Sequence, residues 1–555
     1  MPELPARPSL EQYRKQAKEL LRALRAGNVD ALDRLRRWHP RFRKLTPQQL
    51  SGQVSALTLA DAQLVIARAH AFPSWPKFVA HHETLLVIQS LENSAGGQDL
   101  RDPVSLFIEF ASVERHGWHG SGSLRQANLI LARYPHVAAA SIDTAALLAD
   151  EPALRAFLAQ DPALATAPGG PYHWDPLTYL CFSRYLRLDP SRSGAFVACA
   201  RLLLEAGASA NTGWMETLDE DPPRQFLESV LYAAAGLARN PALTQLLLDH
   251  GADPNDEETC YHAPESRDNA VIQVLIDSRR CNERSLAWLA ARKADWHDEQ
   301  GLLLALDGGA NPNHMTKWSH TPFQHSIRRD NGLGMIRMFL DHGADPYLRN
   351  KDENRNAFQM AAYHGRGDIL RELEARGFAP GYDGPTPALD QLIAACALAD
   401  AARVRALLAA GPDLHQQLLQ IGGSLLCHFS RVDNLAGVRI LLDLGIPVDA
   451  LWPEGDAYFD NTRNSTALHV AAWLASHDVV RELIARGANV NALDARSRTP
   501  LQLAVKACID SYWMRHRQPD SVAALLAAGA TPQGIKLPTG YDAIDALLIP
   551  APHSS

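Results

Sequence analysis

One short phrase recurs along this chain at a fixed interval, and it limits the folds open to the chain more than any other feature. The phrase is a leucine-rich run, then glycine, then often alanine, aspartate or asparagine. It reads LLLDHGADPN at 246–255, FLDHGADPY at 339–347 and LIARGANVN at 483–491. Five glycines follow one another at intervals of 34 residues: Gly309, Gly343, Gly377, Gly411 and Gly445. Such a period indicates a solenoid, in which each unit packs on its neighbours.

A second phrase stands upstream of the later glycines. It reads HTPFQHS at 320–326, STALHVAAW at 465–473 and RTPLQLAV at 498–505. The period alone fits both ankyrin and tetratricopeptide repeats, but the Trp-Leu-Gly-Tyr pattern of the latter is absent. Together the two phrases resemble the ankyrin-repeat family, whose units begin with Thr-Pro-Leu-His-x-Ala-Ala and end with Gly-Ala-Asp-x-Asn. The resemblance implies an all-α solenoid of stacked helix pairs joined by short hairpin loops.

The chemistry of these letters agrees with that expectation. Pro322 and Pro500 suit the first position of a helix, where the N–H has no helical partner, and the preceding threonine can cap the turn. Glycine after the leucine-rich run suits the left-handed conformation that ends a second helix. The Asn or Asp that follows predicts a turn into the next hairpin loop. For His469, at the signature histidine position, the resemblance implies hydrogen bonds that join adjacent hairpin loops.

Departures from the period predict enlarged loops. The first is an acidic stretch at 212–225 that contains Trp214, the second is a finger at 453–464, and the third, at 508–519, separates two helices of one unit. None of them carries the repeat signature.

The N-terminal segment is different, because its apolar residues keep helical spacing without that signature. We expect helices at 9–26 and at 29–38, the second capped by Asn28, and a third at 59–70 that Thr58 and Asp61 begin as a capping box. This segment resembles a leader found ahead of ankyrin repeats in some bacterial proteins. The expected parts are a helical N-terminal leader at 1–92, degenerate ankyrin-like repeats at 99–168 and an ankyrin-repeat solenoid at 169–550.

Composition narrows the classes of partner. A net charge of -8 gives no overall attraction to nucleic acid or to an anionic membrane, so neither is expected as a partner. The seven cysteines lie far apart with no Cys-x-x-Cys pair, which favours a reducing cytoplasm and buried thiols such as Cys396 and Cys427. No export signal and no apolar run of about 20 residues is visible, so a cytoplasmic protein is expected.

Chemistry-bearing clusters were sought among the 22 histidines and the glycine-rich stretches. His116 and His119 lie among glycines in ERHGWHG, and two ligands are too few for a metal site, so we interpret both as surface-loop residues. The GSGS run at 120–123 lacks the Gly-Lys-Ser/Thr of a phosphate-binding loop. We therefore predict no catalytic residue, no cofactor and no metal.

The function that the resemblance implies is non-enzymatic protein binding on a concave face. In the family frame, that face presents the residues after the Ala-Ala position of each first helix: Arg328, Arg329, Tyr363, His364, Arg431 and Trp473. The loops add finger residues: Lys317, Trp318, His320, Arg355 and Arg498. This basic and aromatic set predicts another protein as partner, bound through an acidic or aromatic segment.

Two alternatives stay open. The set can be a group of ordinary solvated side chains, with Trp473 half covered by the 453–464 finger. The chain can also be an enzyme or a self-assembling structural protein whose activity lies in the N-terminal helical segment, although the sequence shows no cluster of acid, base and nucleophile there.

A truncation tests the stacking of repeats. Removing the chain from Asp494 onward is expected to expose the leucine face of the 465–491 unit and to cause aggregation, since that face loses its neighbour. Light scattering of the shortened and full-length proteins measures this. A shortened protein that stays monomeric with an unchanged denaturant midpoint would contradict the stacking.

Overall fold

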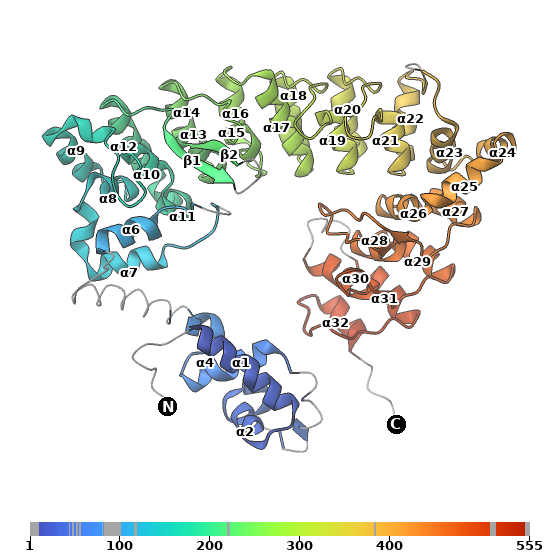
Figure 1. Ribbon diagram of the computed structural model, residues 1–555, viewed down its shortest axis with the longest axis horizontal. Coiled ribbons are helices and arrows are strands. Elements are labelled where there is room, and N and C mark those ends of the chain that lie inside the picture. Colours follow the sequence, from blue (N-terminus) through green and yellow to red (C-terminus); the bar gives the residue numbers. More distant parts are fainter. Residues whose placement is uncertain are drawn as a thin grey trace. The chain divides into compact units, whose positions relative to one another are not determined.

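The computed structural model describes residues 10–43, 45–46, 49–50, 54, 57–79, 82, 102–115, 119–218, 223–381, 384–510 and 518–549. The chain divides into two compact units, Met1–Asp256 and Glu257–Ser555. Helices make up nearly all of the regular structure in both units (Figure 1), which confirms the all-α solenoid. The predicted boundary at 92 lies outside the described residues.

Unit 1 begins with a small helical bundle. Its helices are α1 (Leu10–Arg25), α2 (Val29–Trp38), the short 3-10 helix η1 (Pro40–Phe42) and α4 (Leu59–Ala69). Tyr13, Leu35 and Phe78 lie in its core. The predicted caps are confirmed, because the Asn28 side chain accepts a hydrogen bond from an N–H of the next turn and Thr58 forms a capping box with Asp61.

The rest of unit 1 consists of short helices and one β-hairpin. The helices are α6 (Pro103–Ala111), α7 (Arg125–Arg133), η4 (Pro135–Ala139), α8 (Ile142–Leu147), α9 (Glu151–Gln160), η5 (Pro162–Ala165), α10 (Pro176–Cys181), α11 (Arg184–Leu188), η6 (Pro190–Arg192), α12 (Ser193–Glu205), α13 (Val230–Tyr232), η7 (Ala233–Leu237) and α14 (Pro241–Asp249). The expected loop at 212–225 instead takes part in two antiparallel strands, β1 (Gly213–Leu218) and β2 (Arg224–Ser229), with Gly213 opposite Ser229.

Unit 2 consists of successive helix pairs. Its helices are α15 (Thr259–His262), α16 (Ala270–Asp277), α17 (Glu283–Asp295), α18 (Glu299–Asp307), α19 (Pro322–Arg328), α20 (Leu333–Asp341), α21 (Ala357–Tyr363), α22 (Gly367–Ala375), α23 (Ala388–Ala397), α24 (Ala401–Ala410), α25 (Asp413–Gln420), α26 (Gly422–Arg431), α27 (Leu435–Asp443), α28 (Ala467–Trp473), α29 (His477–Ala485), α30 (Pro500–Ile509), α31 (Asp520–Ala527) and α32 (Asp542–Leu548). Two short antiparallel strands, β3 (Leu451–Trp452) and β4 (Ser465–Thr466), lie at the ends of the 453–464 finger.

The helix pairs stack in two rows. First helices pack on first helices, as α17, α19, α21 and α23 do in turn, and α26, α28 and α30 after them. Second helices pack on second helices, for example α18 on α20 and α27 on α29. Figure 1 shows the pairs α17 and α18, α19 and α20, and α21 and α22 side by side. None of the helices within the described ranges has both the length and the apolar character needed to cross a bilayer.

Hydrogen bonds between units come from the signature residues. The Thr321 and Thr499 side chains cap α19 and α30 as predicted. His469 Nε2 lies 3.1 Å from the carbonyl oxygens of Ala492 and Arg498, which confirms that this histidine joins neighbouring hairpin loops. Asparagines link consecutive turns in the same way, since the Asn313 amide donates to the Gly343 carbonyl at 2.9 Å.

The repeated glycines adopt the left-handed conformation with one exception. Gly309 and Gly343 have φ of +97° and +82°, values that other residues adopt only with strain. Gly411 has φ of -134°, so the prediction is wrong there. The reason is that α25 follows α24 almost at once, which places an additional helix where the other units have a hairpin loop.

Leucine burial provides a test of this packing. Leu441 on α27 is fully buried between repeats, so Leu441→Ala is expected to lower the free energy of unfolding by about 2 to 5 kcal/mol. Leu493→Ala is the matched control, because Leu493 is 62% exposed, and it is expected to change stability by no more than about 0.5 kcal/mol. Urea unfolding followed by circular dichroism measures both. Equal losses in the two variants would contradict the packing.

Candidate functional site

A cleft of about 1220 Å³ lies in unit 2, where the first helices end. It follows the turns after α17, α19, α21, α26 and α28, so five repeats contribute to it. Its lining is rich in charged residues: Arg267, Arg292, Asp295, His297, Asp330, Arg366, Asp368, Arg371, Arg431 and Asp433. Tyr458 and Phe459 of the 453–464 finger also line it.

The 453–464 finger folds back onto the ends of the first helices. Its Tyr458 hydroxyl donates to the Asp295 carbonyl at 2.7 Å, and the Arg329 guanidinium lies 3.7 Å from the centre of the Tyr458 ring. The Trp473 indole N–H donates to the Phe459 carbonyl at 2.5 Å. An aromatic segment of the chain is therefore held on the same surface as the cleft.

The acidic residues of the finger pair with arginines. Asp456 lies 2.8 Å from Arg431 Nη1, and Asp460 lies 2.8 Å from Arg498 Nη1. Arg431 also stacks on the Phe459 ring, with the guanidinium 4.6 Å from its centre. The segment DAYFD at 456–460 thus contacts basic and aromatic side chains at several points along its length.

Asp295 holds three cationic or imidazole groups at one edge of the cleft. Its carboxylate accepts from His325 Nε2 at 2.8 Å and from Arg329 Nε at 2.6 Å, and it pairs with Arg292. Burial alone would raise the pKa of this carboxyl, but the hydrogen bond from His325 and the charges of its partners hold that pKa well below its usual range. Asp295 is therefore ionised at neutral pH and fixes the Arg329 side chain under Tyr458.

Arg431 crosses the floor of this region. Its side chain is fully buried, and its Nε lies 2.7 Å from Asp330 while its Nη2 donates to His364 Nδ1 at 2.7 Å. Burial, together with the nearby His428 and Arg431, lowers the pKa of His364 well below its usual value, so the ring is neutral and can accept this bond. A buried arginine with two carboxylates and an imidazole is a positioning element that a partner does not reach directly.

The eleven residues predicted from the sequence fall into several groups. Arg329, Arg431, Trp473 and Arg498 surround the finger, as described above. Lys317, Trp318 and His320 form a second group, in which Trp318 packs on Trp288 with ring centres 4.5 Å apart and His320 bonds to His325 at 2.8 Å. These three lie against each other rather than along a stripe.

The remaining predicted residues make local pairs. Arg355 stacks on Tyr363 at 3.6 Å, and Arg328 pairs with Asp352 at 3.1 Å. His364 bonds to Arg431. Trp473 is only 3% exposed, since the finger covers it, so its ring is part of the interior and not of an open surface.

Of the predicted set, only Arg431 lines the cleft. The residues that sequence reasoning missed lie one to three positions later, in the turns between first and second helices, such as Asp330, Gly365 and Asp433. These three adopt positive φ, and Gly365 and Asp433 occupy equivalent turns of different repeats. The repeat register could have indicated them. The finger's DAYFD sequence was a second signal, because it is acidic and aromatic.

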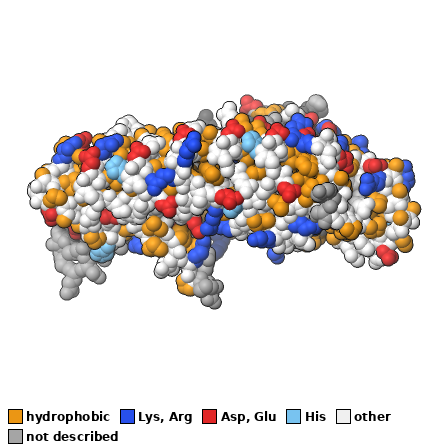
Figure 2. Space-filling model, turned by 90° about the horizontal axis from the view of Figure 1, so that it is seen from above, with side chains coloured by type: hydrophobic (Ala, Val, Ile, Leu, Met, Phe, Trp, Pro, Cys, Tyr) orange, Lys and Arg blue, Asp and Glu red, His pale blue; other side chains and the backbone are white. Residues whose placement is uncertain are grey.

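Charge on the surface is mixed. On the face drawn in Figure 2, Lys and Arg side chains alternate with Asp and Glu side chains over the described residues. The electrostatic character of the cleft therefore comes from local arrangement and not from a broad field of one sign.

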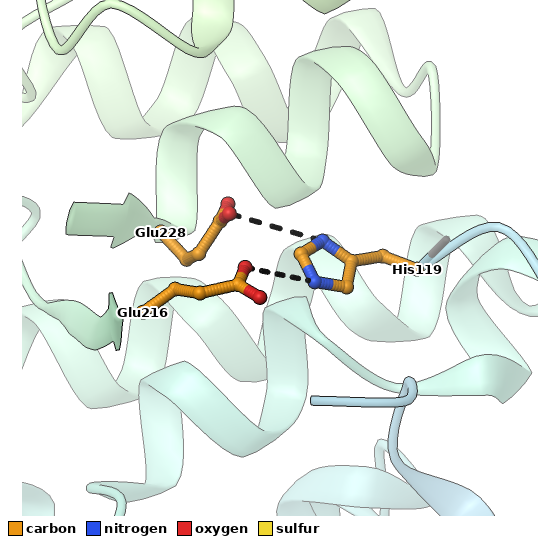
Figure 3. Close-up of side chains that lie close together, drawn as sticks. All are labelled: His119, Glu216 and Glu228. Atoms are coloured by element: carbon orange, nitrogen blue, oxygen red, sulfur yellow. Dashed lines mark ion pairs between the residues drawn. The ribbon is translucent and has the colours of Figure 1, made fainter. Parts of the chain in front are cut away.

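His119 in unit 1 differs from its predicted place in a surface loop. It is buried, and it lies between Glu216 of β1 and Glu228 of β2 (Figure 3). Its Nε2 is 3.3 Å from Glu216 Oε2 and its Nδ1 is 3.9 Å from Glu228 Oε1. The surface-loop interpretation failed because the glutamates come from the 212–225 insertion, about 100 residues later in the sequence. His116 lies outside the described residues.

Comparisons with known proteins agree on the repeat. Family models described as "Ankyrin repeats (many copies)" and "Ankyrin repeats (3 copies)" match residues 324–373 and 392–494. The mitochondrial disaggregase of Bos taurus is 26% identical over 208 residues, which are 34% of this chain and 29% of that protein. The chain thus matches less than a third of the length of this curated relative.

Solved ankyrin repeat domains also match. That of Bcl-3, a member of the IkappaB protein family, is 22% identical and covers 43% of this chain and 97% of its own, with a TM-score of 0.19. That of human ASB11 is 18% identical and covers 49% of this chain and 98% of its own, with a TM-score of 0.21.

The Asp295 cluster yields a prediction about acid stability. Asp295→Asn keeps the shape but leaves Arg292 and Arg329 without their shared anion, so it is expected to lower the free energy of unfolding by about 3 kcal/mol at pH 7. The folded-state pKa is depressed, so the ionised carboxylate stabilises the fold above the unfolded pKa of about 4, and this contribution is lost as the pH falls further.

Urea unfolding at pH 7, 5 and 3.5 is expected to show wild type and variant converging at the lowest pH. Asp443→Asn is the matched control, since Asp443 is 64% exposed and pairs with Arg486 on the surface; it is expected to change stability by less than about 1 kcal/mol. A difference between wild type and Asp295→Asn that stays constant across this range would contradict the assigned pairing.

Proposed function

The chain is an ankyrin-repeat protein, and from that premise we propose that its repeats bind an acidic, aromatic segment of another protein on a concave face. Ankyrin repeats indicate a scaffold for protein–protein interaction. The concave face is the one on which the first helices end, and it includes the cleft and the finger. The partner is a protein segment whose carboxylates meet arginines and whose rings pack beside Tyr458.

The observation that carries this proposal is the position of the finger. DAYFD at 456–460 is itself an acidic, aromatic segment, and it contacts Arg329, Arg431 and Arg498 through stacking and ion pairs. A surface that holds such a segment of its own chain has the chemistry to hold a similar segment of another protein. The finger therefore serves as an internal example of the ligand.

Two further arginines give the cleft room for an added ligand. Arg267 and Arg371 line it and are exposed, whereas Arg292, Arg366 and Arg431 already pair with carboxylates of the chain. Exposed guanidinium groups bind carboxylates in a bidentate manner at little cost in desolvation. We place the acidic residues of the partner at Arg267 and Arg371, with its aromatic residues beside Tyr458.

This arrangement revises the roles of the predicted residues. Arg329 and Tyr363 stay as half-buried side chains that a ligand can contact. Trp473 and Arg431 support the surface from beneath, so substituting them would disturb the fold as well as binding.

A peptide experiment on the full chain tests the proposal. Residues 456–460 are replaced by Gly-Ser-Gly-Ser-Gly to free the surface, and a fluorescent peptide of residues 454–461 is added. The replaced variant is expected to bind the peptide at least about tenfold more tightly than the wild type, in which the finger competes, and Arg329→Ala in the replaced chain is expected to weaken binding by about tenfold. Fluorescence anisotropy measures each affinity.

The controls separate chemistry from folding. Arg337→Ala in the replaced chain is the matched control, because Arg337 is 54% exposed on α20 and pairs with Glu372 away from the finger. A peptide with both aspartates changed to asparagine tests the charge. If the replaced variant folds yet binds both peptides equally weakly, this surface does not recognise acidic, aromatic segments.

A further inference from the structure

Three side chains that sequence alone does not connect come together in unit 1. His119 follows α6, whereas Glu216 and Glu228 lie on the two strands of the hairpin, with 5%, 7% and 2% of their surfaces exposed. One donor atom from each lies within 4.8 Å of the other two. Figure 3 shows both carboxylates directed at the imidazole ring. An imidazole nitrogen and two carboxylate oxygens form a ligand set for a divalent metal ion.

The charges of the cluster require a cation. Two buried carboxylates carry two negative charges, and one imidazole can supply only one positive charge by taking a proton. The nearest guanidinium, that of Arg115, lies 5.7 Å from the Trp214 ring centre and 5.4 Å from that of Tyr172. Buried charge without full compensation is strongly unfavourable. A divalent cation bound by a neutral imidazole would neutralise both glutamates at once.

The ring nitrogens of His119 have different surroundings. Nδ1 lies 3.2 Å from the Tyr232 hydroxyl, which can accept its proton and so leave the Nε2 lone pair facing Glu216. A metal-binding histidine commonly donates its other N–H to such a group. The Nε2 to Oε2 separation of 3.3 Å equals the edge of about 3.3 Å between two ligands of tetrahedral zinc, whose bonds are about 2.0 to 2.1 Å long.

The surroundings of the cluster are aromatic. The Trp214 ring meets the His119 ring edge-on with centres 5.5 Å apart, and Trp174 stacks on Trp214 at 5.6 Å. The indole N–H of Trp214 is buried and has no hydrogen-bond acceptor among the described residues. A water molecule carried by a bound ion would give a donor in this place an acceptor. A polar ligand set inside an apolar shell is the usual setting of a metal site.

We propose that His119, Glu216 and Glu228 bind one Zn²⁺ ion, which joins the hairpin of β1 and β2 to the segment that follows α6. Because its ligands come from two parts of the chain about 100 residues apart, the ion stabilises the folded form of unit 1. The hairpin is an insertion in the repeat, and this ion is what fixes it to the preceding helices.

Zinc titration of the full-length protein tests the proposal. Protein dialysed against a chelator and then against buffer is titrated with Zn²⁺ in competition with a chromogenic chelator. One equivalent per chain is expected, and Glu216→Gln and His119→Gln are each expected to weaken binding by about tenfold or more. Glu205→Gln, on an exposed residue of α12, is the matched control and is expected to bind like the wild type. Circular dichroism confirms that each variant is folded.

Thiols and protons are the two competing explanations, and the experiment separates them. Cys260 and Cys281 have sulfurs 3.8 Å apart, so Cys281→Ser is included and is expected to leave the stoichiometry unchanged. Added Zn²⁺ is also expected to raise the thermal midpoint of the wild type and of Glu205→Gln but not that of Glu216→Gln. No uptake by the wild type, or uptake that only Cys281→Ser removes, would overturn the proposal; the first result would mean that a proton on His119 joins the glutamates instead.

Discussion

No helix pair in this chain can bury its own apolar face, and the rest of the structure depends on that limit. First helices must cover first helices and second helices must cover second helices, as α17 to α23 and α26 to α30 do. The stacking leaves the turns at the ends of the first helices free of packing duty. These turns are where the arginines and aspartates of the cleft lie, so the same constraint that builds the core also provides the candidate binding surface.

Local sequence was sufficient where the determining interactions are local. The threonine caps, the positive φ of most repeat glycines and the bonds of His469 each depend on residues within one repeat or its neighbour, and the sequence predicted them. Gly411 shows the limit of that reasoning, because the helix that follows it, and not the glycine itself, sets its conformation.

The residues of the two candidate sites could not be predicted because their contacts are long-range. Tyr458 meets Asp295 across 163 positions of the chain, and His119 meets Glu216 across nearly 100. Both contacts involve insertions, where the 34-residue register gives no guidance. The stripe of residues after the Ala-Ala position was correct in chemistry, since it contained Arg329 and Arg431, but it was displaced from the cleft by the length of one turn.

The finger has a consequence for how unit 2 comes apart. An ideal solenoid contains only nearest-neighbour contacts, so its repeats open one after another from an end. The bond between Tyr458 and Asp295 adds a contact of high sequence separation, which ties the end of α17 to the segment ahead of α28. The repeats between them are enclosed in a closed loop of contacts, and fraying cannot pass through them without first breaking that closure. This part of the array behaves as a single cooperative block inside an otherwise one-dimensional chain.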